Sequence, residues 1–303
     1  MHRPPLWGLL LLAACEAHIA GAPGAQGQTD AGPGVDAGAI DAPPGLGAWS
    51  TPVKIPQASL TTLDEDDVTL SSNALEMIFA VDNKTSAGKD LYYSSRTSAA
   101  APWSAAIKLA FNIATQSDET PRFSADDKTL YFASGRAGNG TLDIYSVSHA
   151  SPDAMTWGLP QPVAAVNTTT LLEKWYMPCG NQYIMVQATA SNGTDLVTGT
   201  VGSATKPTPI TELNSAQNET GTYLSQDCLT IYFASTRPTS TSPSMIYRST
   251  RPSVTAAWAP PAPVTDFTML GGSQEDPWLS PDGHTFVFVS DVAGTKDVYI
   301  STR

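Results

Sequence analysis

Short apolar runs recur along this chain at nearly even intervals, and each follows a polar turn. The clearest are Leu130–Ala133, Ile231–Ala234 and Phe286–Val289. Each run belongs to a pattern that occurs five times, at 66–81, 119–134, 172–187, 220–235 and 275–290. A period of about fifty residues indicates one supersecondary unit repeated, with each copy packing its apolar face against the next.

Each repeat contains four predicted strands. The first ends in an apolar residue and often serine, and a turn follows, most clearly at Asp282-Gly283, where positive φ angles suit a tight hairpin. The second is almost continuously apolar, which is typical of a strand covered on both faces. The third opens with aspartate in four copies, at Asp90, Asp143, Asp195 and Asp297. The fourth begins with tryptophan and often carries proline, which marks a free outer edge.

The repeats predict an all-β fold: a five-bladed β-propeller of four-stranded antiparallel blades within residues 49–303, with first strands starting near 66, 119, 172, 220 and 275. A tryptophan segment, 49–55, precedes the first copy, and the last copy ends after its third strand, 297–301. We therefore expect the N-terminal strand to complete the last blade, which closes the ring and removes two open edges. A divergent sixth blade is the alternative.

One copy carries a specific family resemblance. It reads EDPWLSPDGHTFVFVS at 275–290, followed by Asp297-Val298-Tyr299. It resembles the WD40-like (PD40) repeat of the TolB-like β-propellers, and the copy at 119–134 is also close. The resemblance covers most of 49–303 and implies a periplasmic or cell-surface propeller used as a binding scaffold. TolB carries an additional N-terminal domain where this chain has only a tether, so the role of TolB itself is not implied.

The N-terminus predicts export and lipidation. His2 and Arg3 precede the apolar run 6–14, and Leu12-Ala13-Ala14-Cys15 resembles a bacterial lipobox. We expect a signal peptide at 1–14, a lipid on Cys15, and a disordered Gly/Ala/Pro/Asp tether over 15–48. The protein would then be a lipoprotein of the outer membrane, periplasmic or surface-exposed. The alternative is an ordinary secretory signal with an incidental cysteine.

The amino-acid composition restricts the classes of partner that the protein is expected to bind. Only 15% of the residues are charged, the net charge is −12, and no Lys/Arg cluster exists, which argues against nucleic-acid binding. We expect a monomer, attached to the membrane through its lipid, that binds an envelope protein, a peptide or a glycan. Histidines are few, and His149 and His284 alone lie in the repeats, so a Ser-His-Asp relay or a histidine-based zinc site is not expected.

Carboxylates recur at the start of the first strand and could ring the central channel: Asp66, Glu119, Glu173, Glu219 and Glu275. They leave two alternatives to a non-catalytic scaffold. A glycoside hydrolase needs two carboxylates with different pKa values, and a calcium ion could be held by several such oxygens. Repetition in nearly every blade favours a structural role, so we expect no catalytic residue and no cofactor.

Ligand contacts are expected where the repeat varies. One first-strand position varies between the blades, and its large side chains are the candidate ligand-facing residues Arg122, Trp175, Tyr223 and Trp278. The alternative is that these side chains pack between blades.

Two cysteines fall in the same predicted turn of adjacent blades. Because an exported protein lives where disulfides persist, we expect a bond between Cys179 and Cys228. The alternative is two unrelated thiols whose Cα atoms lie too far apart to be bridged.

Overall fold

The computed structural model describes residues 46–60, 62–84, 88–149, 156–189, 193–239 and 243–303. The predicted signal peptide (1–14), the predicted lipidation site Cys15 and nearly all of the predicted tether (15–48) lie outside the described residues. Within the described ranges, no helix has the length and apolar character needed to cross a membrane.

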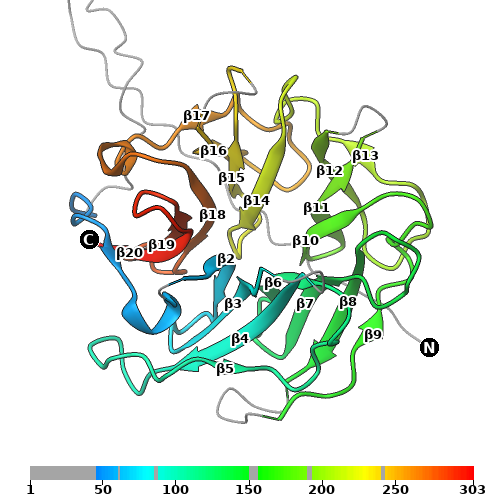
Figure 1. Cartoon of the computed structure of the whole chain (residues 1–303). Coiled ribbons are helices and arrows are strands. Elements are labelled where there is room, and N and C mark those ends of the chain that lie inside the picture. Colours follow the sequence, from blue (N-terminus) through cyan, green and yellow to red (C-terminus); the bar gives the residue numbers. More distant parts are fainter. Residues whose placement is uncertain (1–45, 61, 85–87, 150–155, 190–192, 240–242) are drawn as a thin grey trace, which may run out of the picture. The chain divides into compact units, whose positions relative to one another are not determined.

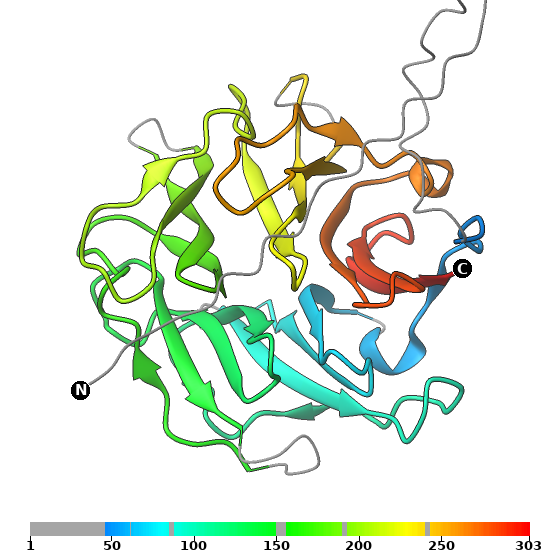
Figure 2. The same ribbon diagram turned by 180° about the vertical axis from the view of Figure 1, so that it is seen from behind.

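Five four-stranded antiparallel sheets stand in a ring, which confirms the predicted five-bladed β-propeller (Figure 1; Figure 2, seen from behind). From the axis outward, the strands are as follows: blade 1, β2 (Asp64–Leu70), β3 (Glu76–Asp82), β4 (Lys89–Ser95) and β5 (Ile107–Lys108); blade 2, β6 (Asp118–Phe123), β7 (Thr129–Ser134), β8 (Asp143–Ser148) and β9 (Gln161–Pro162); blade 3, β10 (Glu173–Cys179), β11 (Gln182–Ala188), β12 (Thr194–Thr200) and β13 (Thr208–Pro209); blade 4, β14 (Glu219–Leu224), β15 (Thr230–Ser235), β16 (Met245–Thr250) and β17 (Ala262–Pro263); blade 5, β18 (Gln274–Leu279), β19 (Thr285–Ser290), β20 (Asp297–Thr302) and β1 (Val53–Lys54). Two short 3-10 turns, Pro56–Ala58 and Thr268–Leu270, are the helical elements of the described residues.

The second strand of each blade carries the core. Its apolar run is buried on both faces, so that Phe79, Phe132, Phe233 and Phe288 are at most 1% exposed. Each blade thereby packs on both neighbours, as the uninterrupted apolar runs predict.

The ring is closed by the two ends of the described chain. Val53 of β1 pairs with Ile300 of β20. Lys54 Nζ lies 2.6 Å from Asp297 Oδ1, and the Ser50 N–H donates to the Thr302 carbonyl at 2.8 Å. The predicted completion of the last blade by the N-terminal strand is confirmed.

The recurrent tryptophan lies four residues before each short outer strand rather than inside it. Trp103 is covered by Arg96 and Trp258 by Arg251, in both cases with the guanidinium carbon 4.4 Å from the ring centroid. Each arginine directly follows the third strand of its blade and holds the tryptophan by a cation–π contact. Blade 3 has lost its tryptophan and has Val201 at the arginine position.

A β-bulge interrupts every inner strand at the same point. The register with the second strand shifts in all five blades. The first bulge residue has positive φ in each blade: Asp67, Thr120, Trp175, Gly221 and Asp276. A bulge re-aims side chains and bends the strand, and here it divides the axis into a strand-start end, before the bulges, and a turn end, beyond them.

Candidate functional site

The strand-start end of the axis gathers three of the five predicted channel carboxylates. Asp66, Glu119 and Glu275 directly precede the bulges of blades 1, 2 and 5, and ion pairs join them across the blades. The equivalent residue in blade 3 is Lys174.

Glu173 and Glu219 do not join this group, because each lies one residue earlier on its strand and so faces the other side. Glu173 accepts hydrogen bonds from Thr168 Oγ1 at 2.9 Å and Gln187 Nε2 at 3.0 Å. Glu219 pairs with Arg237 at 2.8 Å. The expectation that these two carboxylates ring the channel is therefore wrong; both hold the loop that enters their blade, and burial raises the pKa of Glu173 to about 7.

Three lysines neutralise the axial carboxylates. Lys296 Nζ lies 2.6 Å from Glu275 and 3.1 Å from Asp66. Lys89 Nζ lies 2.7 Å from Asp66 and 3.4 Å from Glu119. Lys174 Nζ lies 3.0 Å from Glu119.

The lysines also set the pKa of the central carboxylate. Burial alone would raise the pKa of Asp66, but the charges of Lys89 and Lys296 outweigh it and hold that pKa well below its usual range. The ion pairs thus form a chain from blade 5 through blades 1 and 2 to blade 3.

Asp276 occupies the bulge layer below these ion pairs. Its Oδ1 accepts a hydrogen bond from Trp175 Nε1 at 3.0 Å, and its Oδ2 accepts one from the Asp67 N–H at 3.2 Å. Burial, reinforced by the neighbouring charges of Asp67 and Asp66, raises the pKa of Asp276 well above its usual range. Burial and these charges thus favour the neutral form of this carboxyl group.

Three acidic residues here could in principle face one cation. Single oxygens of Asp66, Glu275 and Asp276 lie within 4.8 Å of one another. Lys296 already contacts two of them, so its ammonium group supplies the positive charge that a bound ion would supply. We therefore assign no metal to these residues.

Arg122 fixes the bulge layer from the turn end. Its Nε donates to the Thr222 carbonyl at 2.9 Å, and its Nη1 donates to the carbonyls of Val68 at 3.1 Å and Pro121 at 2.7 Å. These carbonyls belong to the bulges of blades 4, 1 and 2. Nη2 makes no hydrogen bond within the described residues and lies 3.8 Å from Asp276 Oδ1. One buried guanidinium thus ties three blades together at the axis.

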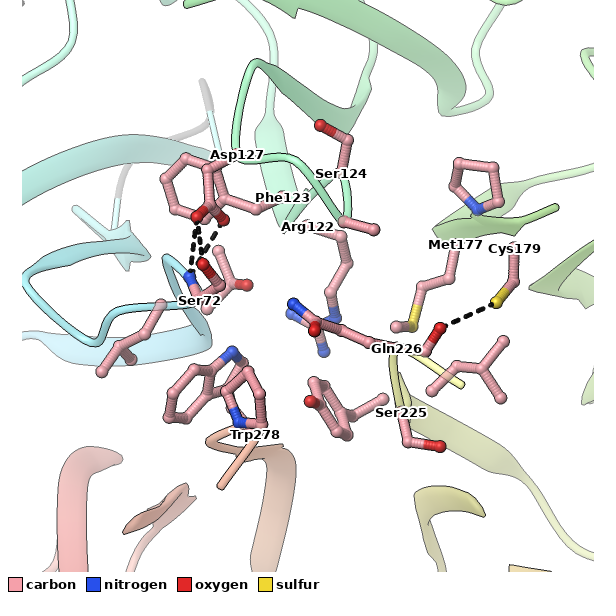
Figure 3. A pocket seen from close by; sticks show the side chains of 17 residues that line it. Ser72, Arg122, Phe123, Ser124, Asp127, Met177, Cys179, Ser225, Gln226 and Trp278 are labelled. Carbon is pink, nitrogen blue, oxygen red and sulfur yellow. Dashed lines mark hydrogen bonds between the residues drawn. The ribbon is translucent and has the colours of Figure 1, made fainter. Parts of the chain in front are cut away.

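A pocket opens at the turn end, directly beyond this guanidinium. We call this cavity of about 60 Å³ the turn-end pocket. One side chain from each blade faces it: Thr69, Arg122, Met177, Tyr223 and Trp278. Figure 3 shows Arg122 near the middle of the group, with Trp278 and Met177 on different sides of it.

Three of the four candidate ligand-facing residues, Arg122, Tyr223 and Trp278, thus line the pocket, whereas Trp175 lies in the bulge layer. Met177 takes the pocket position in blade 3. The turn of blade 3, where Cys179 pairs with Gln182, is two residues shorter than the others, and this displaces its inner strand by two positions. The short turn was the signal that could have identified Met177.

Two cross-links between blades stand at the rim of the pocket. Asp127 Oδ1 accepts a hydrogen bond from the Ser72 N–H at 2.9 Å, and Asp127 Oδ2 accepts one from Ser72 Oγ at 2.5 Å. A disulfide joins Cys179 to Cys228, with the Cα atoms 6.1 Å apart. The junctions between blades 1 and 2 and between blades 3 and 4 are therefore fixed beside the pocket.

Comparison with known proteins supports the fold alone. No family model and no curated protein matches the chain. An α-L-arabinofuranosidase from Podospora anserina, solved with cellotriose, is 11% identical with a TM-score of 0.54, and the match covers 85% of this chain and 96% of that one. The catalytic domain of an α-L-arabinofuranosidase from Coprinopsis cinerea is also 11% identical, with a TM-score of 0.53 and coverage of 84% and 96%. A putative TolB from Agrobacterium tumefaciens is 17% identical, with a TM-score of 0.49 and coverage of 79% and 76%.

Proposed function

We propose that this protein is a non-catalytic binding scaffold whose ligand site is the turn-end pocket. The observation that supports this most is the pairing of Asp66, Glu119 and Glu275 with lysines. Carboxylates already occupied by ion pairs with lysines suit a structural role better than that of an acid or base. The turn end instead offers five chemically different side chains around one small cavity, and such variation serves recognition.

The setting we propose is the bacterial outer membrane. Its support is the sequence Leu12-Ala13-Ala14-Cys15, which has the form of a lipidation site. A propeller attached in this way would meet envelope proteins, peptides and glycans.

A binding screen on the full chain tests the proposal. Trp278 lines the pocket, so its indole N–H signal in ¹H–¹⁵N spectra, assigned by its loss in Trp278→Phe, reports on occupancy. We expect at least one class among small acids, peptides and neutral sugars to shift this signal in a saturable way. A signal that no class moves would overturn the proposal.

A glycoside-processing enzyme is the second candidate, and one observation favours it. The pKa of Asp276 is raised and that of Asp66 is lowered, and such a divergence characterises an acid–base pair. Against it, both side chains are less than a tenth exposed and Lys296 contacts Asp66. Hydrolysis of aryl glycosides by the wild-type protein, abolished by Asp276→Asn, would establish the enzyme.

A further inference from the structure

The turn-end pocket presents hydrogen-bond donors without partners. Arg122 Nη2, which is buried, makes no hydrogen bond within the described residues. Thr69 Oγ1 and Trp278 Nε1 likewise donate to no other described residue, and both side chains line the cavity. These donors come from blades 1, 2 and 5, so the ring itself brings them together.

Two polar side chains of the pocket are already engaged with other protein groups. Tyr223 Oη donates to the Leu279 carbonyl at 2.5 Å. The carboxylate of Asp127, on the rim, is held by three hydrogen bonds from Ser72. The Asp127 carboxylate is thus already bound, whereas Thr69 Oγ1 and Trp278 Nε1 remain able to donate, and a ligand group that accepts hydrogen bonds would complement them.

The pocket also lies beside a positive charge with little compensation. The three hydrogen bonds of Arg122 go to neutral carbonyls. The nearest carboxyl group, that of Asp276, is 3.8 Å away, and burial together with the charges of Asp67 and Asp66 raises its pKa well above its usual range. A buried guanidinium whose hydrogen bonds all go to neutral carbonyls, and whose nearest carboxyl group has a raised pKa, favours an anion in the adjoining cavity.

The size and the apolar walls of the pocket restrict the kind of anion that it can hold. A cavity of about 60 Å³ has room for roughly four water molecules. Met177, Leu70 and Leu224 form part of its lining. A carboxylate with one or two methylene groups suits this small volume and these apolar walls.

We propose that the turn-end pocket binds an aliphatic carboxylate, either of a small acid or at the end of a peptide. The inference rests on the proposed function and adds the chemical class of the ligand. Thr69 Oγ1 and Trp278 Nε1 donate to the carboxylate oxygens. Arg122 Nη2 has almost no exposed surface, so Arg122 attracts the ligand through its charge.

Titration of the full chain with propionate and with propionamide tests the charge requirement. The two probes have nearly the same shape, and only propionate is an anion. We expect propionate to shift the Trp278 indole signal with saturation, and propionamide to bind at least about tenfold more weakly. A tripeptide with a free C-terminal carboxylate and its amidated form, used in the same way, distinguish a peptide end from a free acid.

Substitutions in the pocket test which side chains bind the carboxylate. Arg122→Gln should weaken propionate binding at least about tenfold, whereas Arg248→Gln, which makes the same change outside the pocket lining, should leave it unaltered. If Arg122→Gln does not fold, Thr69→Val is the second variant, because it removes one donor without touching the guanidinium, and it should weaken propionate several-fold.

Each outcome is decisive. Equal binding of propionate and propionamide, or unchanged binding in folded Arg122→Gln and Thr69→Val, would overturn the carboxylate proposal. If a neutral sugar shifts the Trp278 signal and propionate does not, the carboxylate proposal fails while the proposed binding function stands. If no probe of any class shifts it, both fail.

Discussion

Asp127 and Cys228 occupy the same position in the turns of blades 2 and 4, and each joins its blade to the blade before it. Both have positive φ, 58° and 63°. Asp127 holds Ser72 by hydrogen bonds, and Cys228 holds Cys179 by a covalent bond. The same turn position thus supports two kinds of link to the preceding blade: hydrogen bonds from Asp127 in blade 2 and a disulfide from Cys228 in blade 4.

This equivalence makes the junction of blades 1 and 2 a site for a second disulfide. The double variant Ser72→Cys, Asp127→Cys should oxidise spontaneously, because Asp127 stands at the position from which Cys228 already reaches the preceding blade, and Ser72 is already its hydrogen-bond partner. Intact mass after thiol alkylation, with and without reductant, should show two disulfides. The single variant Ser72→Cys provides the control with one free thiol. Two alkylated cysteines in the double variant, while the native bond is intact, would contradict the equivalence.

Removal of the disulfide between Cys179 and Cys228 should lower the stability of the folded protein. The disulfide spans 49 residues, and the chain-entropy treatment of such a loop gives about 4 kcal/mol, of which measured cases deliver about 2–4. We expect Cys228→Ser to lower the free energy of unfolding by that amount in urea denaturation. Reductant should destabilise the wild-type protein and leave the variant unchanged. Equal midpoints for the two proteins would refute this expectation.

Gly221 is required by the bulge layer. Its φ is +51°, and an added Cβ would lie 2.7 Å from the Asp276 backbone nitrogen. Gly221→Ala should therefore cost about 3 kcal/mol or more, since backbone strain and a clash with backbone add together. Gly202 is the matched control: its φ is +74°, but an added Cβ meets nothing within 4 Å. Gly202→Ala should cost about 1 kcal/mol, and thermal unfolding of both variants measures the difference.

Glu65 should make stability fall as the pH rises. Burial raises its pKa to about 8 in the folded protein, whereas in the unfolded chain it titrates near its ordinary value. Its contribution is thus fully present below about pH 4.5 and is lost as the pH rises through about 8.

The variant Glu65→Gln isolates this effect. It keeps the acceptor for the Leu60 N–H, which is 3.0 Å from Glu65 Oε1, and it cannot ionise. We expect the variant to gain on the order of 3 kcal/mol relative to wild type between pH 5 and pH 8. Glu212→Gln, at an exposed position, should show no such gain. Parallel pH profiles for wild type and Glu65→Gln would rule the effect out.

The blade architecture could be predicted because it depends on patterns that every copy repeats. Apolar second strands, turn residues and the early tryptophan each recur, so an error in one copy is corrected by the others. Trp175 is a residue that alignment of the repeats places incorrectly. The sequence aligns blade 3 by its second strand, but the turn before that strand is two residues shorter. Trp175 consequently moves to the bulge layer and Met177 takes its place at the pocket.

The carboxylates show a second reason why sites are harder to predict than blades. Side chains alternate along a strand, so a displacement of one residue carries a side chain from the axis to the opposite side. Glu173 and Glu219 are displaced in this way and bind loop residues. The ion-pair partners of the remaining carboxylates could not be predicted from the sequence either. Lys89 and Lys296 come from the start of the third strands, and they meet Asp66 only in the closed ring.

The way the last blade is completed also affects the rate of folding. Ser50 and Ser301, 251 positions apart, are hydrogen-bonded within it. During synthesis, the N-terminal strand emerges first and stays unpaired until almost the whole propeller has followed. Contacts of such long range slow the final step of folding, so a chain delayed at this stage would expose the unfinished edge of blade 5 to whatever extended peptide or chaperone is at hand.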